Sequence, residues 1–199
     1  ALICASFNIK SEDQNKSDKF VVVLDAGHGG KDPGNLGNGY REKEIALNVV
    51  LKIGEELEKN PNIKVVYTRK TDVFVDLFDR GKIANKANAD VFVSIHCNAH
   101  KSQAYGTETF VLGIHKNQTN FEVAKKENAV IFMESDHESK YAGFDPNSPE
   151  SAISIILGQE EYLDQSILLA SLIQDNFTSK LKRTNRRVKQ AGLMVLRQT

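Results

Sequence analysis

The stretch that decides the fold lies near the start of the chain and reads Phe20-Val21-Val22-Val23-Leu24-Asp25-Ala26-Gly27-His28-Gly29-Gly30. A short β-branched run closed by glycines is typical of a buried parallel strand that ends in a loop. Comparable apolar runs over 63–68 and 91–96, and an alternating run over 107–112, predict three further strands. In a sheet of this kind, ligands bind beyond the carboxyl ends of the strands.

Segments with helical spacing separate these strands. Apolar residues recur every three or four positions from Glu42 to about residue 57, from 75 to 88 and from 160 to 182. This order predicts an α/β fold, with an open, mostly parallel twisted sheet and helices on both faces. Residues 113–160 are polar and too long for an ordinary connection, so they form either a lid-like insertion or a mobile stretch.

The composition limits the classes of partner. The chain has 199 residues, with 26 Lys and Arg against 26 Asp and Glu, and this length is typical of one domain or two small ones. A balanced charge offers no global positive field to nucleic acid. No apolar run approaches the roughly 20 residues of a membrane span. We therefore expect no nucleic-acid partner and no membrane span.

The first residues are expected to lie outside the fold. Ala1 to Phe7 is apolar and small, and the chain is then polar up to Lys19, as in the tail of a secretory signal. A short frayed terminus is the alternative. The expectation is a signal-peptide remnant or disordered leader over 1–18, followed by one domain over 19–199.

Two histidines and one glutamate are candidate metal ligands. His28 follows the first strand, His96 closes the strand over 91–96, and Glu42 stands where the glycine loop meets a helix. Two imidazoles and a carboxylate with an open fourth position form a known catalytic zinc arrangement. Taken alone, Glu42 is most simply an acidic residue at a helix start.

Three alternatives concern other parts of the chain. The glycine loop could cradle phosphate, but it lacks the spacing of a dinucleotide fingerprint. Cys97 could be a nucleophile, although adjacent strand residues face opposite sides, so a buried apolar cysteine is the better interpretation. The basic cluster Lys180–Lys189 is interpreted as a solvated helix end, with an anion-binding patch as the alternative.

Beyond the opening stretch, a series of short motifs runs along the chain from Lys31 to Arg197. They are Lys31-Asp32-Pro33-Gly34, Arg41-Glu42-Lys43-Glu44, Thr68-Arg69, Asp72, Arg80, Ala84-Asn85, Ala89-Asp90, Ser94-Ile95-His96-Cys97-Asn98-Ala99, Gly106-Thr107-Glu108-Thr109 and Gln190-Ala191-Gly192-Leu193-Met194-Val195-Leu196-Arg197. With this set, residues 20–199 closely resemble the zinc-dependent N-acetylmuramoyl-L-alanine amidases, the peptidoglycan amidases of bacterial cell separation. The resemblance implies one zinc ion per chain, held by His28, Glu42 and His96. It also implies hydrolysis of the amide bond between N-acetylmuramic acid and the L-alanine of the stem peptide.

One element of the family pattern is missing from the printed sequence. The family's second catalytic carboxylate is a Glu on a strand soon after the Leu196-Arg197 segment, so it is expected beyond Thr199, with the final strand and helix. Loss of a general acid–base group costs about 10²–10⁴-fold in rate. We therefore expect zinc binding but weak or no hydrolysis by this chain, and a zinc- and glycan-binding module without activity is the alternative.

The resemblance also gives residues 113–160 a regulatory role. Division amidases carry an extra helical segment that sits over the zinc, and a partner protein with a degenerate endopeptidase fold removes it. Glu127 and Glu134 are the candidates for a carboxylate that fills the open zinc position; a surface excursion without regulatory contact is the alternative. The family further implies a periplasmic or extracellular location, and we expect a monomer.

A different zinc peptidase is the remaining alternative. Such an enzyme would need an arginine in the cleft that reads a substrate carboxylate. Arg69 and Arg80 are the arginines considered for this role, and the sequence does not place either of them.

Overall fold

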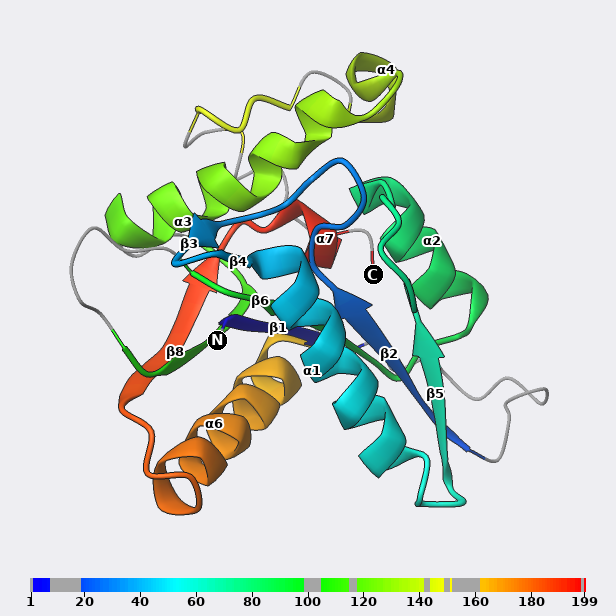
Figure 1. The fold of residues 1–199 in the computed structure, drawn as a ribbon, viewed down its shortest axis with the longest axis vertical. Helices are drawn as coiled ribbons and strands as arrows, with labels where there is room; N and C mark the ends of the chain where they lie inside the picture. The colour runs from blue at the N-terminus through cyan, green and yellow to red at the C-terminus, as the bar shows by residue number, and fades with distance from the viewer. Residues whose placement is uncertain are drawn as a thin grey trace.

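A six-stranded sheet forms the centre of the protein, as the computed structural model shows (Figure 1). The structure describes residues 2–7, 19–98, 105–114, 118–141, 144–148, 151, 162–197 and 199. The strand order is β5-β2-β6-β1-β7-β8. The strands are β1 Leu2–Phe7, β2 Phe20–Ala26, β5 Ile63–Tyr67, β6 Val91–His96, β7 Thr107–Leu112 and β8 Asn185–Ala191. A small separate hairpin pairs β3 Leu36–Gly37 with β4 Tyr40–Arg41.

The sheet consists of two parallel halves that run in opposite directions. Strand β2 pairs in parallel with β5 and β6, and β7 pairs in parallel with β1 and β8. Among the described strands of this sheet, only β1 and β6 are antiparallel neighbours. The prediction of a mostly parallel sheet is therefore confirmed.

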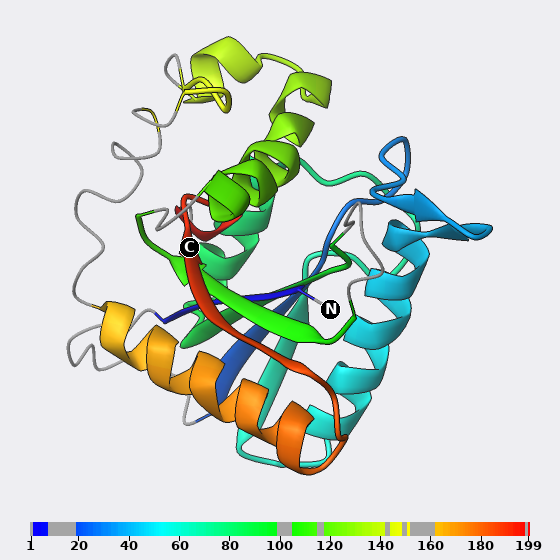
Figure 2. The ribbon, with the colours of Figure 1, turned by 90° about the vertical axis from the view of Figure 1, so that its left-hand side faces the viewer.

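Helices cover both faces of the sheet (Figure 2). Helices α1 Glu42–Leu57 and α6 Leu163–Ser179 share one apolar cluster with Val22, Leu24 and Ile95. The opposite cluster contains Val23 and Phe92. The elements that pack there are α2 Leu77–Lys86, α3 Gln118–Asn128, the 3-10 helix η1 Ala129–Met133, α4 His137–Tyr141 and α7 Met194–Arg197.

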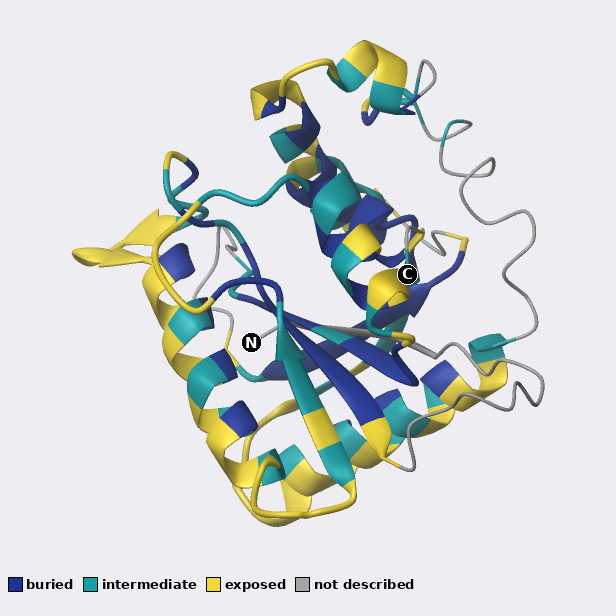
Figure 3. Ribbon diagram, turned by 90° about the vertical axis from the view of Figure 1, so that its right-hand side faces the viewer, coloured by how far each residue is buried: buried dark blue, intermediate teal, exposed yellow. Residues whose placement is uncertain are grey.

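Burial is concentrated in the central strands (Figure 3). Residues 21–26 of β2 are all buried, because the strand lies between β5 and β6 and beneath helices on both faces. A strand buried on both sides needs a continuous apolar run rather than an alternating one, which explains the stretch quoted above. Among the described residues, no helix has both the length and the hydropathy to cross a membrane.

Two segments differ from the sequence-based expectation. Leu2–Phe7 forms β1, between β6 and β7, so the prediction that all of residues 1–18 lie outside the fold is wrong for this part. Residues 8–18 lie outside the described part. A short apolar run fits a strand as well as a signal, because composition alone does not distinguish them.

The second difference is β8. The cluster Lys180–Lys189 was expected to be a helix end, but α6 ends at Ser179 and Asn185–Ala191 forms an edge strand beside β7. Edge strands carry charged side chains, which hides the apolar alternation on which strand prediction depends.

Candidate metal centre

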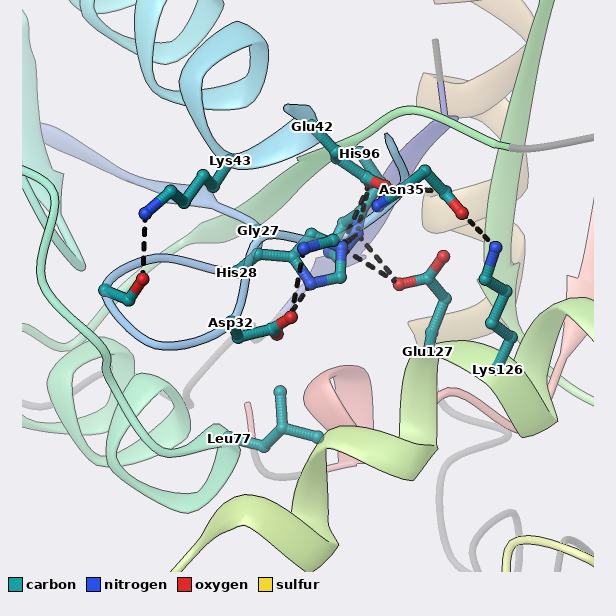
Figure 4. Close-up of polar contacts among 12 residues, drawn as sticks. Gly27, His28, Asp32, Asn35, Glu42, Lys43, Leu77, His96, Lys126 and Glu127 are labelled. Atoms are coloured by element: carbon teal, nitrogen blue, oxygen red, sulfur yellow. Dashed lines mark hydrogen bonds and ion pairs between the residues drawn. The ribbon is translucent and has the colours of Figure 1, made fainter. Parts of the chain in front are cut away.

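Three segments bring the predicted ligands to one edge of the sheet (Figure 4). His28 lies in the loop after β2, and His96 is the last residue of β6. These strands are parallel neighbours, so their carboxyl ends meet. Glu42 is the first residue of α1 and is buried, with its carboxylate directed at both imidazole rings.

The three side chains are in mutual contact. Glu42 Oε1 lies 3.1 Å from His28 Nε2 and 3.2 Å from His96 Nδ1. The two ring nitrogens are 3.1 Å apart. Residues 28, 42 and 96 therefore meet at one point, as the sequence analysis expected.

Helix α3 supplies a fourth group. Glu127 Oε2 lies 3.0 Å from His96 Nδ1 and 3.5 Å from His28 Nε2. This oxygen is buried, and apart from these two ion pairs it has no hydrogen-bond partner among the described residues. A buried carboxylate oxygen is costly unless it is paired, and its pairing here depends on a proton at His96. A metal ion shared by the four groups would be an alternative partner.

The geometry fits a four-coordinate metal. Donor atoms at about 2.0–2.1 Å from a tetrahedral zinc are separated by roughly 3.3–3.4 Å. Five of the six separations among the four groups range from 3.0 to 3.5 Å, and all four donor atoms lie within 4.8 Å of one another. Two imidazoles and two carboxylates are suitable ligands for zinc, and the carboxylates balance its charge. The residues present therefore fit the ion that the sequence analysis predicted.

Asp32 fixes the orientation of His28. Its Oδ2 lies 2.7 Å from His28 Nδ1, which leaves Nε2 facing Glu42. This carboxylate–histidine pair is the usual support of a metal-binding imidazole. Burial alone would lower the pKa of His28, but the contacts with Asp32 and Glu42 outweigh it and raise this pKa.

Asn35 and Cys97 fix the orientation of Glu42. The Asn35 backbone N–H donates to Glu42 Oε2 at 2.8 Å and its side-chain Nδ2 at 2.6 Å, while the Cys97 N–H donates to Oε1 at 2.6 Å. Burial would raise the pKa of Glu42, but its contacts with His28 and His96 hold it far below the usual range. Glu42 is therefore ionised, as a metal ligand must be.

The pKa of His96 depends on both carboxylates. Burial alone would lower it, but Glu127 and Glu42 raise it well above the usual value. In the absence of metal this imidazole therefore retains a proton, and a metal ion must displace it.

Gly27 and Gly34 leave space for the imidazole rings of His96 and His28. A Cβ on Gly27 would lie 2.4 Å from His96 Cε1, and a Cβ on Gly34 would lie 2.6 Å from His28 Cδ2. Gly34 also has a φ of 67°, which disfavours a side chain. In this structure the glycine loop therefore gives space to imidazoles rather than to a phosphate.

Two buried arginines hold the loop from beneath. Arg80 donates to Asp25 Oδ1 at 2.6 Å, to Ala26 O at 2.7 Å and to His28 O at 2.9 Å. Arg69 donates to Ala26 O at 2.9 Å and to Gly27 O at 2.8 Å. Both guanidinium groups are engaged with the loop, so neither is the cleft arginine that a different zinc peptidase would need.

Glu134 does not join the metal-ligand group, which corrects the prediction for this residue. Its Oε1 accepts from Leu77 N at 2.7 Å and its Oε2 from Tyr141 Oη at 2.8 Å. Asp76, the N-cap residue of α2, makes no side-chain cap hydrogen bond. Glu134 therefore satisfies a free N–H at the start of α2, where a negative charge is favoured.

Comparisons with known proteins agree on one family. Residues 22–199 match the Amidase_3 family, described as N-acetylmuramoyl-L-alanine amidase. N-acetylmuramoyl-L-alanine amidase AmiA of Escherichia coli K12 is 31% identical over 94% of this chain and 64% of its own length. An endolysin of Bacillus phage SPP1 is 51% identical over 40% of this chain and 29% of its own length. The chain thus spans less than two thirds of these relatives.

A solved structure shares the fold. The crystal structure of N-acetylmuramoyl-L-alanine amidase from Clostridium difficile 630 matches with a TM-score of 0.65 and 27% identity, over 92% of this chain and 75% of that one.

Proposed function

Because the chain belongs to the Amidase_3 family of N-acetylmuramoyl-L-alanine amidases, we propose that it is a zinc-dependent hydrolase of peptidoglycan. The bond cut joins the lactyl group of N-acetylmuramic acid to the L-alanine of the stem peptide. The observation that carries this proposal is the contact of His28, Glu42 and His96 at 3.1–3.2 Å.

The chain's own residues prepare the site for this chemistry. When bound, zinc supplies a Lewis acid for the amide carbonyl and lowers the pKa of water to about 7. His28 presents Nε2 because Asp32 engages its Nδ1, and Glu42 presents Oε1 because Asn35 holds Oε2. The proton for the leaving amine requires a positioned acid; the Glu expected beyond Thr199 stays a prediction.

We further propose that Glu127 closes the site in this conformation. A catalytic zinc site has three protein ligands and one open position. Glu127 Oε2 lies where that fourth position would be, 3.0 Å from His96 Nδ1. Substrate would enter only after α3 withdraws this carboxylate.

Several contacts hold the closing segment 118–141 in place. Lys126 donates to Asn35 Oδ1, and Lys31 donates to Met133 O. Glu134 caps α2, as described above. These contacts join the segment to the loop that carries His28 and to α2, so a partner that moves α3 would open the site. An activator with a degenerate endopeptidase fold is our candidate for that partner.

The cellular setting follows from the substrate. Peptidoglycan is the proposed partner, and the proposed location is the cell envelope, periplasmic or extracellular, in cell-wall remodelling and cell separation. A monomeric state stays a prediction.

Mass spectrometry of muropeptides tests the proposed activity. The comparison uses a chain extended beyond Thr199 to include the expected Glu. Zinc-loaded, this chain should release stem peptide from muramoyl peptides faster than its His28→Ala variant, which lacks a ligand. Glu127→Ala should release it faster than the wild type, whereas Glu122→Ala, at an exposed position of the same helix, should leave the rate unchanged. Equal rates for wild type and His28→Ala would refute the proposed activity, and equal rates for wild type and Glu127→Ala would refute the closure.

A further inference from the structure

A second charged cluster lies on the same face of the sheet as the metal centre. Glu108 on β7 is 5% exposed and contacts Lys189 and Arg186 of β8 and Asn98, which follows β6. Arg186 Nε lies 3.2 Å from Glu108 Oε2. The cluster unites three segments and has no part in the metal centre described above.

The register places the cluster near His96. Leu2 of β1 pairs with His96 on one side and with Glu108 on the other. Two sheet spacings of about 4.8 Å each separate the two residues, so their Cα atoms lie roughly 10 Å apart. By strand alternation His96 shares a face with Phe92, and Glu108 shares one with Phe110. Both phenylalanines belong to the apolar cluster beneath α3.

A β-bulge brings the two cations together. Thr107 pairs with Asn185 and Thr109 with Val188, so β8 carries one extra residue between these pairs. In a regular strand, Arg186 and Lys189 are three residues apart and would point to opposite faces. The extra residue reverses this parity, and both side chains reach Glu108.

The bulge is strained. Arg187 has a φ of 71°, in the left-handed region that is unfavourable for residues other than glycine. The backbone N–H of Arg187 donates a hydrogen bond to Asn185 Oδ1 at 2.7 Å. Bulges near active sites often re-aim a side chain, and such strain points to a functional demand at the position.

The three charged side chains of the cluster carry a net charge of one positive unit. Arg186 and Lys189 supply two positive charges, and Glu108 supplies one negative charge. Burial would raise the pKa of Glu108, but Lys189, Asn98 and Arg186 lower it. Glu108 is therefore ionised and unsuited to donate a proton, so it does not replace the expected general acid.

The orientation of Arg186 leaves its two terminal guanidinium nitrogens available for a ligand. It uses Nε for Glu108, and no other hydrogen bond of its side chain is found among the described residues. Its side chain is 28% exposed and that of Lys189 is 20% exposed. A guanidinium held at Nε can present its two terminal nitrogens to a carboxylate in bidentate fashion.

We propose that Arg186 and Lys189 form an anion-binding subsite that takes a carboxylate of the stem peptide, two to three residues beyond the bond to be cut. The inference rests on the proposed function. An extended peptide advances about 3.3–3.6 Å per residue, so such a group reaches roughly 7–10 Å from the scissile bond. This is comparable to the roughly 10 Å between the Cα atoms of His96 and Glu108, the residue that both cations contact.

Binding of two reaction-product analogues tests the subsite. The probes are L-alanyl-D-glutamate and L-alanyl-D-isoglutamine, which differ by one carboxylate, and NMR titration of the zinc-loaded protein measures both affinities. The wild type should bind the more charged probe roughly 10-fold or more tightly. Arg186→Gln and Lys189→Gln should each remove most of that preference. Arg187→Gln, which takes an exposed cation from the same bulge, should keep it.

The outcomes separate this inference from the proposed function. Equal affinity for the two probes in the wild type, no binding of either at millimolar concentration, or an equal loss in Arg187→Gln would overturn the subsite. The wild-type comparison needs no variant, so a folding defect in one variant does not decide the matter. A preserved charge preference, with no release of stem peptide from muramoyl peptides by a chain extended beyond Thr199 to the expected Glu, would refute the proposed activity and leave the subsite standing.

Discussion

Replacing Gly27 by alanine tests how closely the metal centre depends on the glycine loop. The added Cβ would lie 2.4 Å from Cε1 of His96, 2.5 Å from Nε2 and 2.7 Å from Nδ1. Because ordinary carbon contacts are about 3.5 Å or longer, the ring must retreat by roughly 1 Å. Zinc ligands are held within about 0.2 Å. His96 Nδ1 would therefore leave coordinating distance.

The expected result is a large loss of zinc affinity. Loss of an orienting partner alone costs about 10–100-fold, so displacement of a ligand should cost about 100-fold or more. Chelator competition measures the affinity, and circular dichroism verifies the fold. The matched control is Gly37→Ala, because a Cβ at Gly37 meets nothing within 4 Å. A folded Gly27→Ala protein that binds zinc as tightly as Gly37→Ala would refute the reasoning.

Three further predictions concern the metal centre and the β8 bulge. Asp32→Asn should weaken zinc binding about 10–100-fold, because Asp32 orients His28; a chelator titration that finds wild-type affinity would contradict this role. Without metal, the protein should lose stability as the pH rises above about 6.5, because the pKa of His96 is raised on folding and its contribution is complete only below the unfolded value. Urea unfolding in chelator at pH 6 and pH 9 measures this change, and greater stability at pH 9 would be inconsistent with it. Arg187→Gly should stabilise the protein by up to about 1 kcal/mol, because it relieves a φ of 71°; a lower urea midpoint would show that the bulge is not strained.

The cluster of candidate metal ligands could be predicted from sequence because topology brings its members together. His28 and His96 follow the ends of neighbouring parallel strands, and such ends meet at one edge of a sheet. The length of the glycine loop then brings Glu42 to the same point. No local spacing reveals such a site, since its members come from three segments.

The supporting residues were missed for a different reason. Asp32 lies four residues after His28, a spacing that could have indicated their contact, but Asn35 carries no comparable signal. Glu127 was proposed from the family resemblance, whereas Glu134 was proposed on the same basis and instead caps α2. Which carboxylate of an insertion reaches a site depends on how its helices pack, and sequence spacing does not contain this information.

Two strands, β8 and β1, were not predicted, because charged residues in the first and a signal-like composition in the second obscure the usual strand pattern. β8 carries Arg186 and Lys189 around a bulge, so no regular alternation of apolar residues remains. β1 is an apolar run whose composition also fits a signal segment. Its strand pairing is decided by the two neighbours, β6 and β7, and therefore by tertiary structure.

X-ray absorption at the zinc edge tests the central claim most directly. The account predicts about one zinc per chain, bound only by nitrogen and oxygen at about 2.0–2.1 Å, with two imidazoles in the shell. A sulfur ligand at about 2.3 Å, which would implicate a cysteine such as Cys97, or zinc that remains bound at full occupancy in His28→Ala, would contradict it.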